Sequence, residues 1–478
     1  MKISKIAVFS AGIILSYSIQ AAENIQNETV VEQVTPNEKI GPLVQYPDAN
    51  IPHKSEGILS KQGDWLAARG IQPTLGFTQM YFTNPNVGIE TNKSEAVSIF
   101  TLGAHVDLEK LVGFKGANLH FEELYVPWIH NLDYGTQASS SIVGTLGPYI
   151  PQKTHLTLFT YEQKFLDNKA TFEVGKSNAG NYFALPMCNS PITCVNASLQ
   201  KVVGMNPPPY ANWSARFAYD LNPKLRIQTG WWRSDAAFPF TDGWESNGGK
   251  FPGTMSNVYL ANVAYKTDFK MEKYPSSWEV LGYHNDAIQQ NPYLTVNHTS
   301  KVFDSESAVK TSSGVSGLYL SGKKTIWRAD GGTTDSPFPK SLSVYANMTH
   351  AFNDDVTVGI QNQGSAGIIL NHAFESRPFD SYSINFLWAR LTDDEQRYLK
   401  DAHLAAGGKG YTVGQTETAI GLDANFILSK GVVLSPFAMY SWDSNTSLSP
   451  NTSVIPESGL SAGVVLHFQF DQMLGLTK

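Results

Sequence analysis

Long apolar runs are absent from most of this 478-residue sequence. After residue 22, no stretch stays apolar for the roughly 18 to 20 residues that a membrane-spanning helix requires. Helical membrane spans are therefore excluded from residue 23 onward, and any crossing of a membrane has to be made by strands.

Charge is also scarce, since charged residues make up 16% of the chain, with 35 Lys and Arg against 42 Asp and Glu. The net charge is −7 and the basic residues form no block, which argues against nucleic acid as a partner. In contrast, aromatic residues reach 12%, and the 39 glycines outnumber Lys and Arg together. This balance favours many strands joined by tight turns.

The first 22 residues are the exception to the lack of apolar runs. Lys2 and Lys5 precede a largely apolar segment at 6–19, and Ala21 or Ala22 offers a small-residue cleavage point. These features are those of a secretory signal peptide, so we expect residues 1–22 to be removed on export.

Only two cysteines are present, Cys188 and Cys194, with five residues between them. Export would place them in an oxidising compartment, so we expect a disulfide that closes one loop. Two cysteines without a neighbouring histidine cannot complete a four-ligand zinc site, and the sequence predicts neither a metal nor a cofactor.

The rest of the chain reads as one large unit without a linker. Residues 23–57 are polar and contain four prolines, so we expect them to form an N-terminal arm. A short helix at 58–69 should precede a sheet that continues to residue 470, and residues 471–478 form a C-terminal extension.

From residue 71 onward, apolar and polar residues alternate with the period of two that is typical of strands with one apolar and one polar face. In residues 416–428 the apolar face carries Ile420 and Leu422, and the polar face carries Glu417 and Asp423. Sixteen strands are expected: 71–82, 98–109, 116–126, 155–165, 169–176, 212–220, 224–233, 256–266, 277–285, 313–328, 341–350, 356–372, 380–390, 413–428, 431–442 and 459–470.

The connections between these segments alternate between tight and long. The tight ones are 166–168, 221–224 and 429–430, and the long ones are 127–154, 177–211, 234–255, 286–312, 391–412 and 443–457. The connection at 351–355 is short where a long one is expected. The predicted fold is all-β, a closed antiparallel transmembrane β-barrel with short periplasmic turns and long extracellular loops. A soluble β-sandwich or β-propeller shows the same alternation of apolar and polar residues and is the alternative fold.

Catalytic signatures are missing, because the sequence contains no GxSxG, HExxH, phosphate loop or dinucleotide fingerprint. Asp393, Asp394 and Glu395 follow Thr392, which predicts a capping box at the start of a short helix in the loop. We therefore expect no catalytic residue and no enzyme activity.

The polar strand faces supply candidates for contact with a solute. Alternation predicts six lumen-facing residues: His120, Glu122, Arg216, Arg226, Gln228 and Trp232. Arginine donors suit hydroxyl and carboxylate groups, an aromatic ring stacks on the apolar face of a pyranose, and the acids Glu122, Glu173 and Asp423 offer acceptors. The alternative is that these charges only hydrate the lumen and pair with one another.

The long connection at 177–211 is the candidate constriction. It contains the predicted disulfide and the stiff run Pro207-Pro208-Pro209, so it would narrow a pore if it folded into the barrel. A lid folded outward is the alternative.

Several short segments, in order along the chain, resemble the carbohydrate-selective porins of the OprB type. They are Gly63-Asp64-Trp65 with Arg69, residues 106–111, residues 161–167, Gly175-Lys176, the two-cysteine loop, residues 215–221 and Arg377-Pro378. The resemblance implies a sixteen-stranded barrel in the Gram-negative outer membrane with an arginine-lined eyelet, to which Arg216 would belong.

The same resemblance implies passive diffusion of glucose and related monosaccharides, with outer-membrane lipid and small sugars as partners. Homotrimers are common among porins, but the sequence indicates no interface. Two departures are Glu122-Glu123, where the family tends toward Asn and Arg, and the eight residues after Phe470. A general or organic-acid porin, or a secreted glycan-binding or glycan-cleaving β protein, are the alternative functions.

Overall fold

The computed structural model describes residues 57–147, 150, 153–205, 210–235, 242–244, 255–333, 336, 338–353 and 355–477. The expected signal peptide, almost all of the N-terminal arm and the run Pro207-Pro208-Pro209 lie outside the described residues. All the expected strands lie largely within them, so the predicted sheet can be compared strand by strand.

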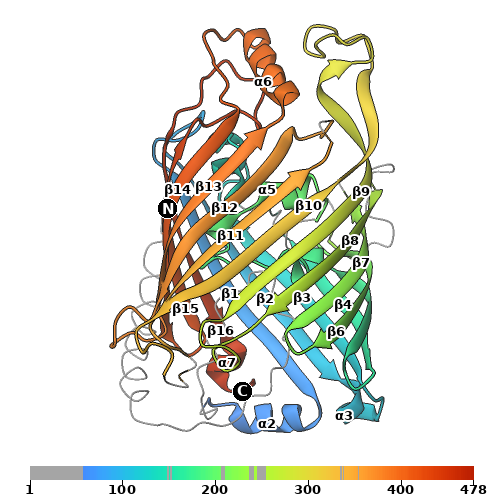
Figure 1. Ribbon diagram of the computed structural model, residues 1–478, viewed down its shortest axis with the longest axis vertical. Helices are drawn as coiled ribbons and strands as arrows, with labels where there is room; N and C mark the ends of the chain where they lie inside the picture. Colours follow the sequence, from blue (N-terminus) through green and yellow to red (C-terminus); the bar gives the residue numbers. More distant parts are fainter. Residues whose placement is uncertain are drawn as a thin grey trace.

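The described residues form one closed antiparallel barrel of sixteen strands, which confirms the predicted fold (Figure 1). Each strand pairs with its neighbours in sequence, and β1 also pairs with β16. The strands are β1 (Ile71–Asn84), β2 (Lys93–Asp107), β3 (Ala117–Ile129), β4 (Thr154–Phe165), β5 (Ala170–Ser177), β6 (Asn212–Asn222), β7 (Leu225–Asp235), β8 (Met255–Lys266), β9 (Ser276–Thr295), β10 (Val309–Arg328), β11 (Ser341–Ala351), β12 (Ile360–Asn371), β13 (Ser381–Leu391), β14 (Thr416–Ser429), β15 (Val432–Trp442) and β16 (Gly459–Gln469).

The largest difference from the predicted strands is at β9, and its partner β10 is extended with it. The sequence predicted an end at 285 and a start at 313, but the strands continue to Thr295 and begin at Val309. This extra length stands as a two-stranded ribbon above the barrel (Figure 1). Both faces of the ribbon lie beyond the membrane, so its residues carry no apolar outward pattern by which it could be recognised. The connection expected at 351–355 is also longer, spanning 352–359.

Helices lie at both ends of the barrel. At the end with short turns, α2 (Ser60–Ala68) matches the expected helix, α3 (Leu108–Val112) follows β2, and α7 (Phe470–Leu474) begins the C-terminal extension. The Leu59 N–H donates to the Leu474 carbonyl at 2.9 Å, so the N-terminal helix and the extension contact each other. No helix in the described part of the chain is long and apolar enough to cross a membrane.

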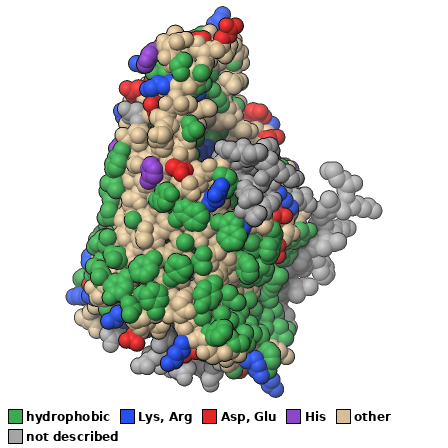
Figure 2. Space-filling view, turned by 90° about the vertical axis from the view of Figure 1, so that its right-hand side faces the viewer, with side chains coloured by type: hydrophobic (Ala, Val, Ile, Leu, Met, Phe, Trp, Pro, Cys, Tyr) green, Lys and Arg blue, Asp and Glu red, His purple; other side chains and the backbone are tan. Residues whose placement is uncertain are grey.

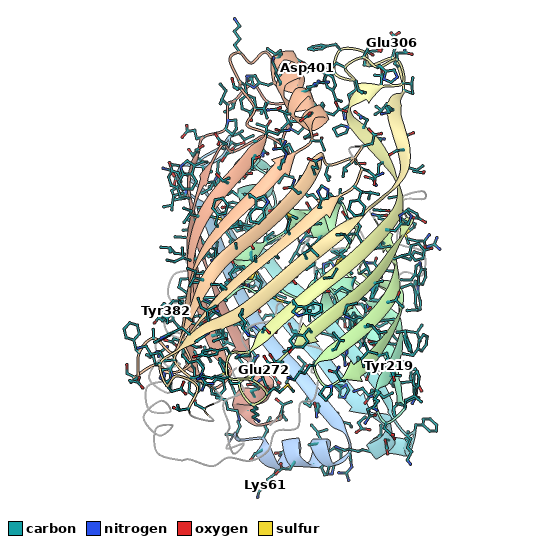
Figure 3. All side chains as sticks on the ribbon, in the orientation of Figure 1. Lys61, Tyr219, Glu272, Glu306, Tyr382 and Asp401 are labelled. Carbon is teal, nitrogen blue, oxygen red and sulfur yellow. A yellow bond between two sulfur atoms is a disulfide. The ribbon has the colours of Figure 1, made fainter. Side chains whose placement is uncertain are left out.

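At the opposite end, α6 (Asp393–Ala405) stands in the connection between β13 and β14. Thr392 caps it by accepting a hydrogen bond from the Glu395 N–H at 3.1 Å, as the capping-box pattern predicted. Figure 3 places Asp401 of this helix above the barrel and Lys61 of α2 below it.

The outer wall of the barrel carries the apolar strand faces. Phe100, Leu102, Ile384, Phe386 and Leu422 are all exposed at outward positions. Hydrophobic side chains gather over the lower part of the wall in the face that Figure 2 presents. A soluble sandwich would bury such residues between two sheets, so this wall is the surface that a membrane covers.

Candidate functional site: a lumen narrowed by inward loops

The connection between β5 and β6 folds into the barrel, which answers the question that the sequence left open. It contains the short 3-10 turns η3 (Ala179–Asn181) and η4 (Ile192–Cys194) and the helix α5 (Ala197–Lys201). Its Ala184 N–H donates to Glu279 of β9 at 3.1 Å, and its Asn189 amide donates to Asp423 of β14 at 2.7 Å. We call residues 178–205 the constriction loop because they follow the inner wall from β5 as far as β14.

The predicted disulfide between Cys188 and Cys194 is formed and closes a small ring at the far end of the constriction loop. Two residues inside this ring, Asn189 and Thr193, both donate to the Asp423 carboxylate. The wall residue Asn385 donates to the same carboxylate at 2.5 Å. Asp423 is buried and accepts three hydrogen bonds, so it is the main polar anchor of the ring.

A second connection, between β3 and β4, also folds inward. It contains α4 (Tyr134–Ala138) and the 3-10 turn η2 (Val143–Thr145). Glu417 of β14 accepts hydrogen bonds from the Ser141 hydroxyl at 2.8 Å and from the Ile142 N–H at 2.9 Å. Buried apolar residues of this connection pack against lumen-facing residues of the wall, including Phe82, Leu387 and Met439.

Arg216 faces the lumen on β6, as the alternation predicted, but it lies beneath the constriction loop. Its guanidinium donates to Glu173 at 2.9 and 3.3 Å and to Gln228 at 3.2 Å. The Tyr182 ring lies 4.2 Å from the Arg216 guanidinium carbon, and the Tyr182 hydroxyl donates to Glu173 at 2.6 Å. Arg216 is only 7% exposed, so in this arrangement it holds the loop.

Trp232 and Gln228 of β7 also hold the constriction loop. Trp232 is 2% exposed, its ring meets Phe183 edge-on at 5.5 Å between centroids, and its indole N–H donates to Ser177 at 3.1 Å. The Gln228 amide donates to the Tyr182 carbonyl at 2.8 Å. The sequence placed both side chains on the correct face but not against this loop.

The remaining three candidates lie on the lumen face and pair with other residues of the wall. Arg226 forms a two-bond ion pair with Asp220 at 2.6 and 2.7 Å. His120 shares a hydrogen bond with His105 at 2.9 Å between the two Nδ1 atoms, and Glu122 accepts from the Thr157 hydroxyl at 2.9 Å. All six candidates are therefore placed as predicted, and their contact with a solute stays a prediction.

The structure joins some of these residues through Glu162 of β4, which the sequence did not single out. The Glu162 carboxylate lies 3.9 Å from His120, 3.8 Å from Arg216 and 3.5 Å from Lys164. The adjacent acids Glu122 and Glu123 of β3 point to opposite faces of the sheet, as expected. Glu122 is buried inside the barrel, and Glu123 on the outer side accepts a hydrogen bond from the Trp244 indole at 3.2 Å. Glu162 occupies a lumen-facing position in the alternating pattern of β4, so the same pattern could have identified it as a lumen residue.

The outer loops pack on the constriction loop through α6. Leu399 of α6 and Ala197 of α5 belong to one buried cluster. Glu395 lies nearby, and burial raises its pKa to about 8, although the positive charges of Lys301 and Lys201 partly offset that rise. The constriction loop is therefore covered from above as well as fastened to the wall.

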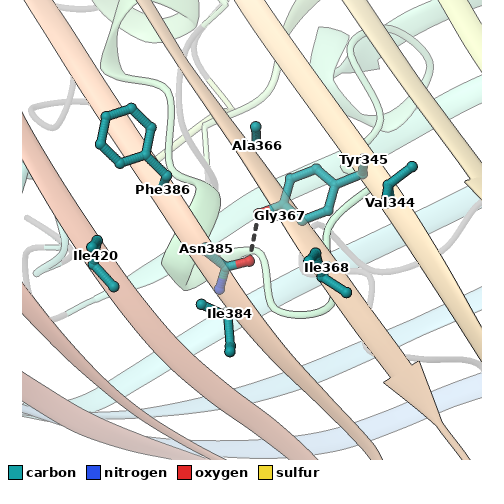
Figure 4. A pocket seen from close by; sticks show the side chains of 9 residues that line it. All are labelled: Val344, Tyr345, Ala366, Gly367, Ile368, Ile384, Asn385, Phe386 and Ile420. Atoms are coloured by element: carbon teal, nitrogen blue, oxygen red, sulfur yellow. Dashed lines mark hydrogen bonds between the residues drawn. The ribbon is translucent and has the colours of Figure 1, made fainter.

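One hollow lies outside the lumen. It measures about 420 Å³ and opens on the wall at β11 to β14, where Ile368, Ile384, Phe386 and Ile420 point outward (Figure 4). The hydrogen bond from the Tyr345 hydroxyl to Asn385 lies behind it at 2.6 Å. Within the described residues, no group of three or more His, Cys, Asp or Glu side chains could hold a metal ion. The hollow is a mainly apolar feature of the membrane-facing wall and lies outside the path of a solute.

A sixteen-strand barrel with an apolar outer wall and a polar lumen narrowed by an inward loop defines a porin. A model of the carbohydrate-selective porin family, OprB, matches residues 96–455 of the chain. The chain belongs to this family, which confirms the resemblance that the sequence indicated. It is an outer-membrane porin of the Gram-negative type.

Known relatives are distant in sequence and close in fold. Porin B of Pseudomonas aeruginosa is 20% identical over 354 residues, which cover 70% of this chain and 74% of that protein. The high-pH structure of Pseudomonas putida OprB has a TM-score of 0.71 at 20% identity and covers 87% of this chain and 99% of that one. The low-pH structure of the same protein has a TM-score of 0.52 at 14% identity, with 86% and 97% covered. At these identities the likeness to the solved structures establishes the barrel alone.

Proposed function

We propose that this porin lets glucose and related monosaccharides diffuse passively through its lumen. The observation that carries the proposal is the constriction loop, which folds into the lumen along a polar wall. Selection then depends on the width of the passage and on weak hydrogen bonds, since a tight site would slow release.

The surface chemistry of the passage supports a sugar as the solute. Leu185, Pro186 and Met187 of the constriction loop are apolar and at least partly exposed, whereas the lumen faces of the strands carry His105, Glu162 and other polar groups. A pyranose presents both apolar C–H faces and hydroxyl edges, so it can contact both kinds of surface. A general porin would need no such apolar surface at its narrowest part.

The six candidate residues then divide into two roles. The Arg226 side chain is 23% exposed, and we propose that it contacts passing solute directly. Arg216, Gln228 and Trp232 instead position the constriction loop, and buried His120 and Glu122 maintain the polar wall. Diffusion of this kind uses no catalytic group. The homotrimer stays a prediction. Chemical cross-linking of the protein in outer membranes measures its oligomeric state.

Swelling of proteoliposomes tests the size limit that this passage implies. We expect isosmotic arabinose and glucose to produce rapid swelling, and a tetrasaccharide such as stachyose to produce at least about tenfold slower swelling, because the loop excludes wide solutes. Vesicles containing heat-denatured protein serve as the control. Equal rates for glucose and stachyose would contradict a constricted passage.

A further inference from the structure

The acidic side chains on the lumen face of the barrel are almost all withdrawn from the passage. Seven of them are at most 9% exposed: Glu95, Glu122, Glu162, Glu173, Glu279, Glu417 and Asp423. Asp423, Glu279 and Glu417 accept hydrogen bonds from the two inward connections, and Glu173 accepts from Tyr182 and Arg216. Four of these acids therefore hold the inward connections, and all seven present little negative charge to a solute.

The basic side chains on the same face are distributed differently. Lys164, Arg226, Lys266 and Lys323 remain partly exposed, and all four lie near the strand ends that carry the short turns. Lys164 and Arg226 have Glu162 and Asp220 as partners at 3.5 and 2.6 Å. The exposed charge of the periplasmic half of the lumen is therefore mainly positive.

Lys266 and Lys323 are the strongest part of this basic surface. Both lie directly opposite Ser277 of β9, one from β8 and one from β10, so their side chains occupy one row on the lumen face. Because both side chains are cationic, they cannot neutralise each other across this row. In the part of the chain that the structure describes, neither forms an ion pair.

The nearest acids are already engaged by other groups. Glu279, one row further into the barrel, accepts from the Asn262 amide at 2.6 Å and from the constriction loop. Glu272 in the turn after β8 pairs with Lys224 at 3.0 Å, and Asp330 after β10 pairs with Arg328 at 2.7 Å. Unpaired charge of one sign in a pore with low-dielectric walls raises the local concentration of the opposite ion.

We propose that Lys266 and Lys323 make this porin prefer carboxylated monosaccharides, the aldonic and uronic acids, over neutral sugars of the same size. This inference rests on the proposed sugar pathway and names a substrate class within it. The loop sets the size of the solute, and the lysine pair attracts its carboxylate on the periplasmic side of the constriction. No deep site is needed, because a field that acts over several ångströms does not hold the solute in place.

Uptake of isotope-labelled D-gluconate and D-glucose into neutral phosphatidylcholine proteoliposomes tests the proposal. The two solutes have the same carbon skeleton, so their ratio reports charge preference at constant size. In the wild type we expect gluconate to enter faster than glucose. In the double variant K266Q/K323Q the gluconate-to-glucose ratio should fall about fivefold at low salt, with the glucose rate nearly unchanged.

The matched control is K324Q, which removes the same charge from the neighbouring residue on the outer face of β10 and should leave the ratio unchanged. Loss of glucose uptake by the wild type would contradict the sugar pathway itself. Glucose uptake with no preference for gluconate, or an unchanged ratio in K266Q/K323Q, would overturn the charge preference alone. The heat-modifiable gel shift of each variant verifies that its barrel is folded.

Discussion

Replacing Asp423 by alanine should raise the single-channel conductance at least twofold and admit oligosaccharides that the wild type excludes. The carboxylate accepts hydrogen bonds from Asn189, Thr193 and Asn385, so D423A removes the charged acceptor that these three donors share. A hydrogen bond to a charged group contributes about 1.5 to 3 kcal/mol, so D423A removes the strongest contacts of the ring and leaves it three neutral hydrogen bonds, from Ser381, Asn385 and Asn425. The far end of the constriction loop should therefore leave the wall.

Planar-bilayer recordings measure the conductance, and liposome swelling with stachyose measures the size limit. D401A is the control, since Asp401 bonds Ser300 above the barrel and has no contact with the constriction loop. The double variant C188S/C194S should have a smaller effect in the same direction, because the open ring gains freedom but keeps its hydrogen-bond donors. A D423A channel with wild-type conductance would mean that the ring is not held by this anchor.

Replacing Glu173 by leucine should lower the free energy of unfolding by about 3 to 5 kcal/mol, the usual cost of leaving a buried charge without its partner. Arg216 would lose the acid that it contacts at 2.9 Å and keep only the more distant Glu162 at 3.8 Å, and Tyr182 would lose its acceptor. The double variant E173L/R216M removes both charges and should recover most of the loss.

Denaturant titration of the protein in lipid vesicles measures these free energies, and R216M alone completes the double-mutant cycle. If E173L differs from the wild type by less than about 1 kcal/mol, Glu162, which lies 3.8 Å from Arg216, has replaced Glu173 as the partner of that arginine. If E173L/R216M is as unstable as E173L, the loss comes from packing around Tyr182 and not from the unpaired charge.

The strands could be predicted from the sequence because alternation and turn length are local signals. A strand in a closed membrane barrel has one lipid face and one lumen face. The alternation therefore placed Ile420 and Leu422 on the outer face and Glu417 and Asp423 on the inner face, where the structure also has them. The same parity placed Arg216 and Trp232 inside. Alternation did not predict the ends of β9 and β10 correctly, because the ribbon that they form has no lipid face.

The packing of the constriction loop could not be predicted in the same way. Its residues pair with distant parts of the chain, such as Asn189 with Asp423, which are 234 residues apart, and alternation carries no information about such pairs. One signal did exist, because Phe183, Val202 and Val203 are apolar residues in a connection that an outward lid would have exposed to water. Those residues are fully buried, which is why the inward conformation is the stable one.

The most direct test of the account is the ion current through single reconstituted channels during titration with glucose. A sugar that enters the constricted passage displaces ions, so the current should fall in steps as millimolar glucose is added, and should recover on washing. The D423A channel, with its passage widened, should be much less sensitive. A stable current in the wild type at all glucose concentrations, from a barrel that is folded and open, would contradict a sugar-selective constriction.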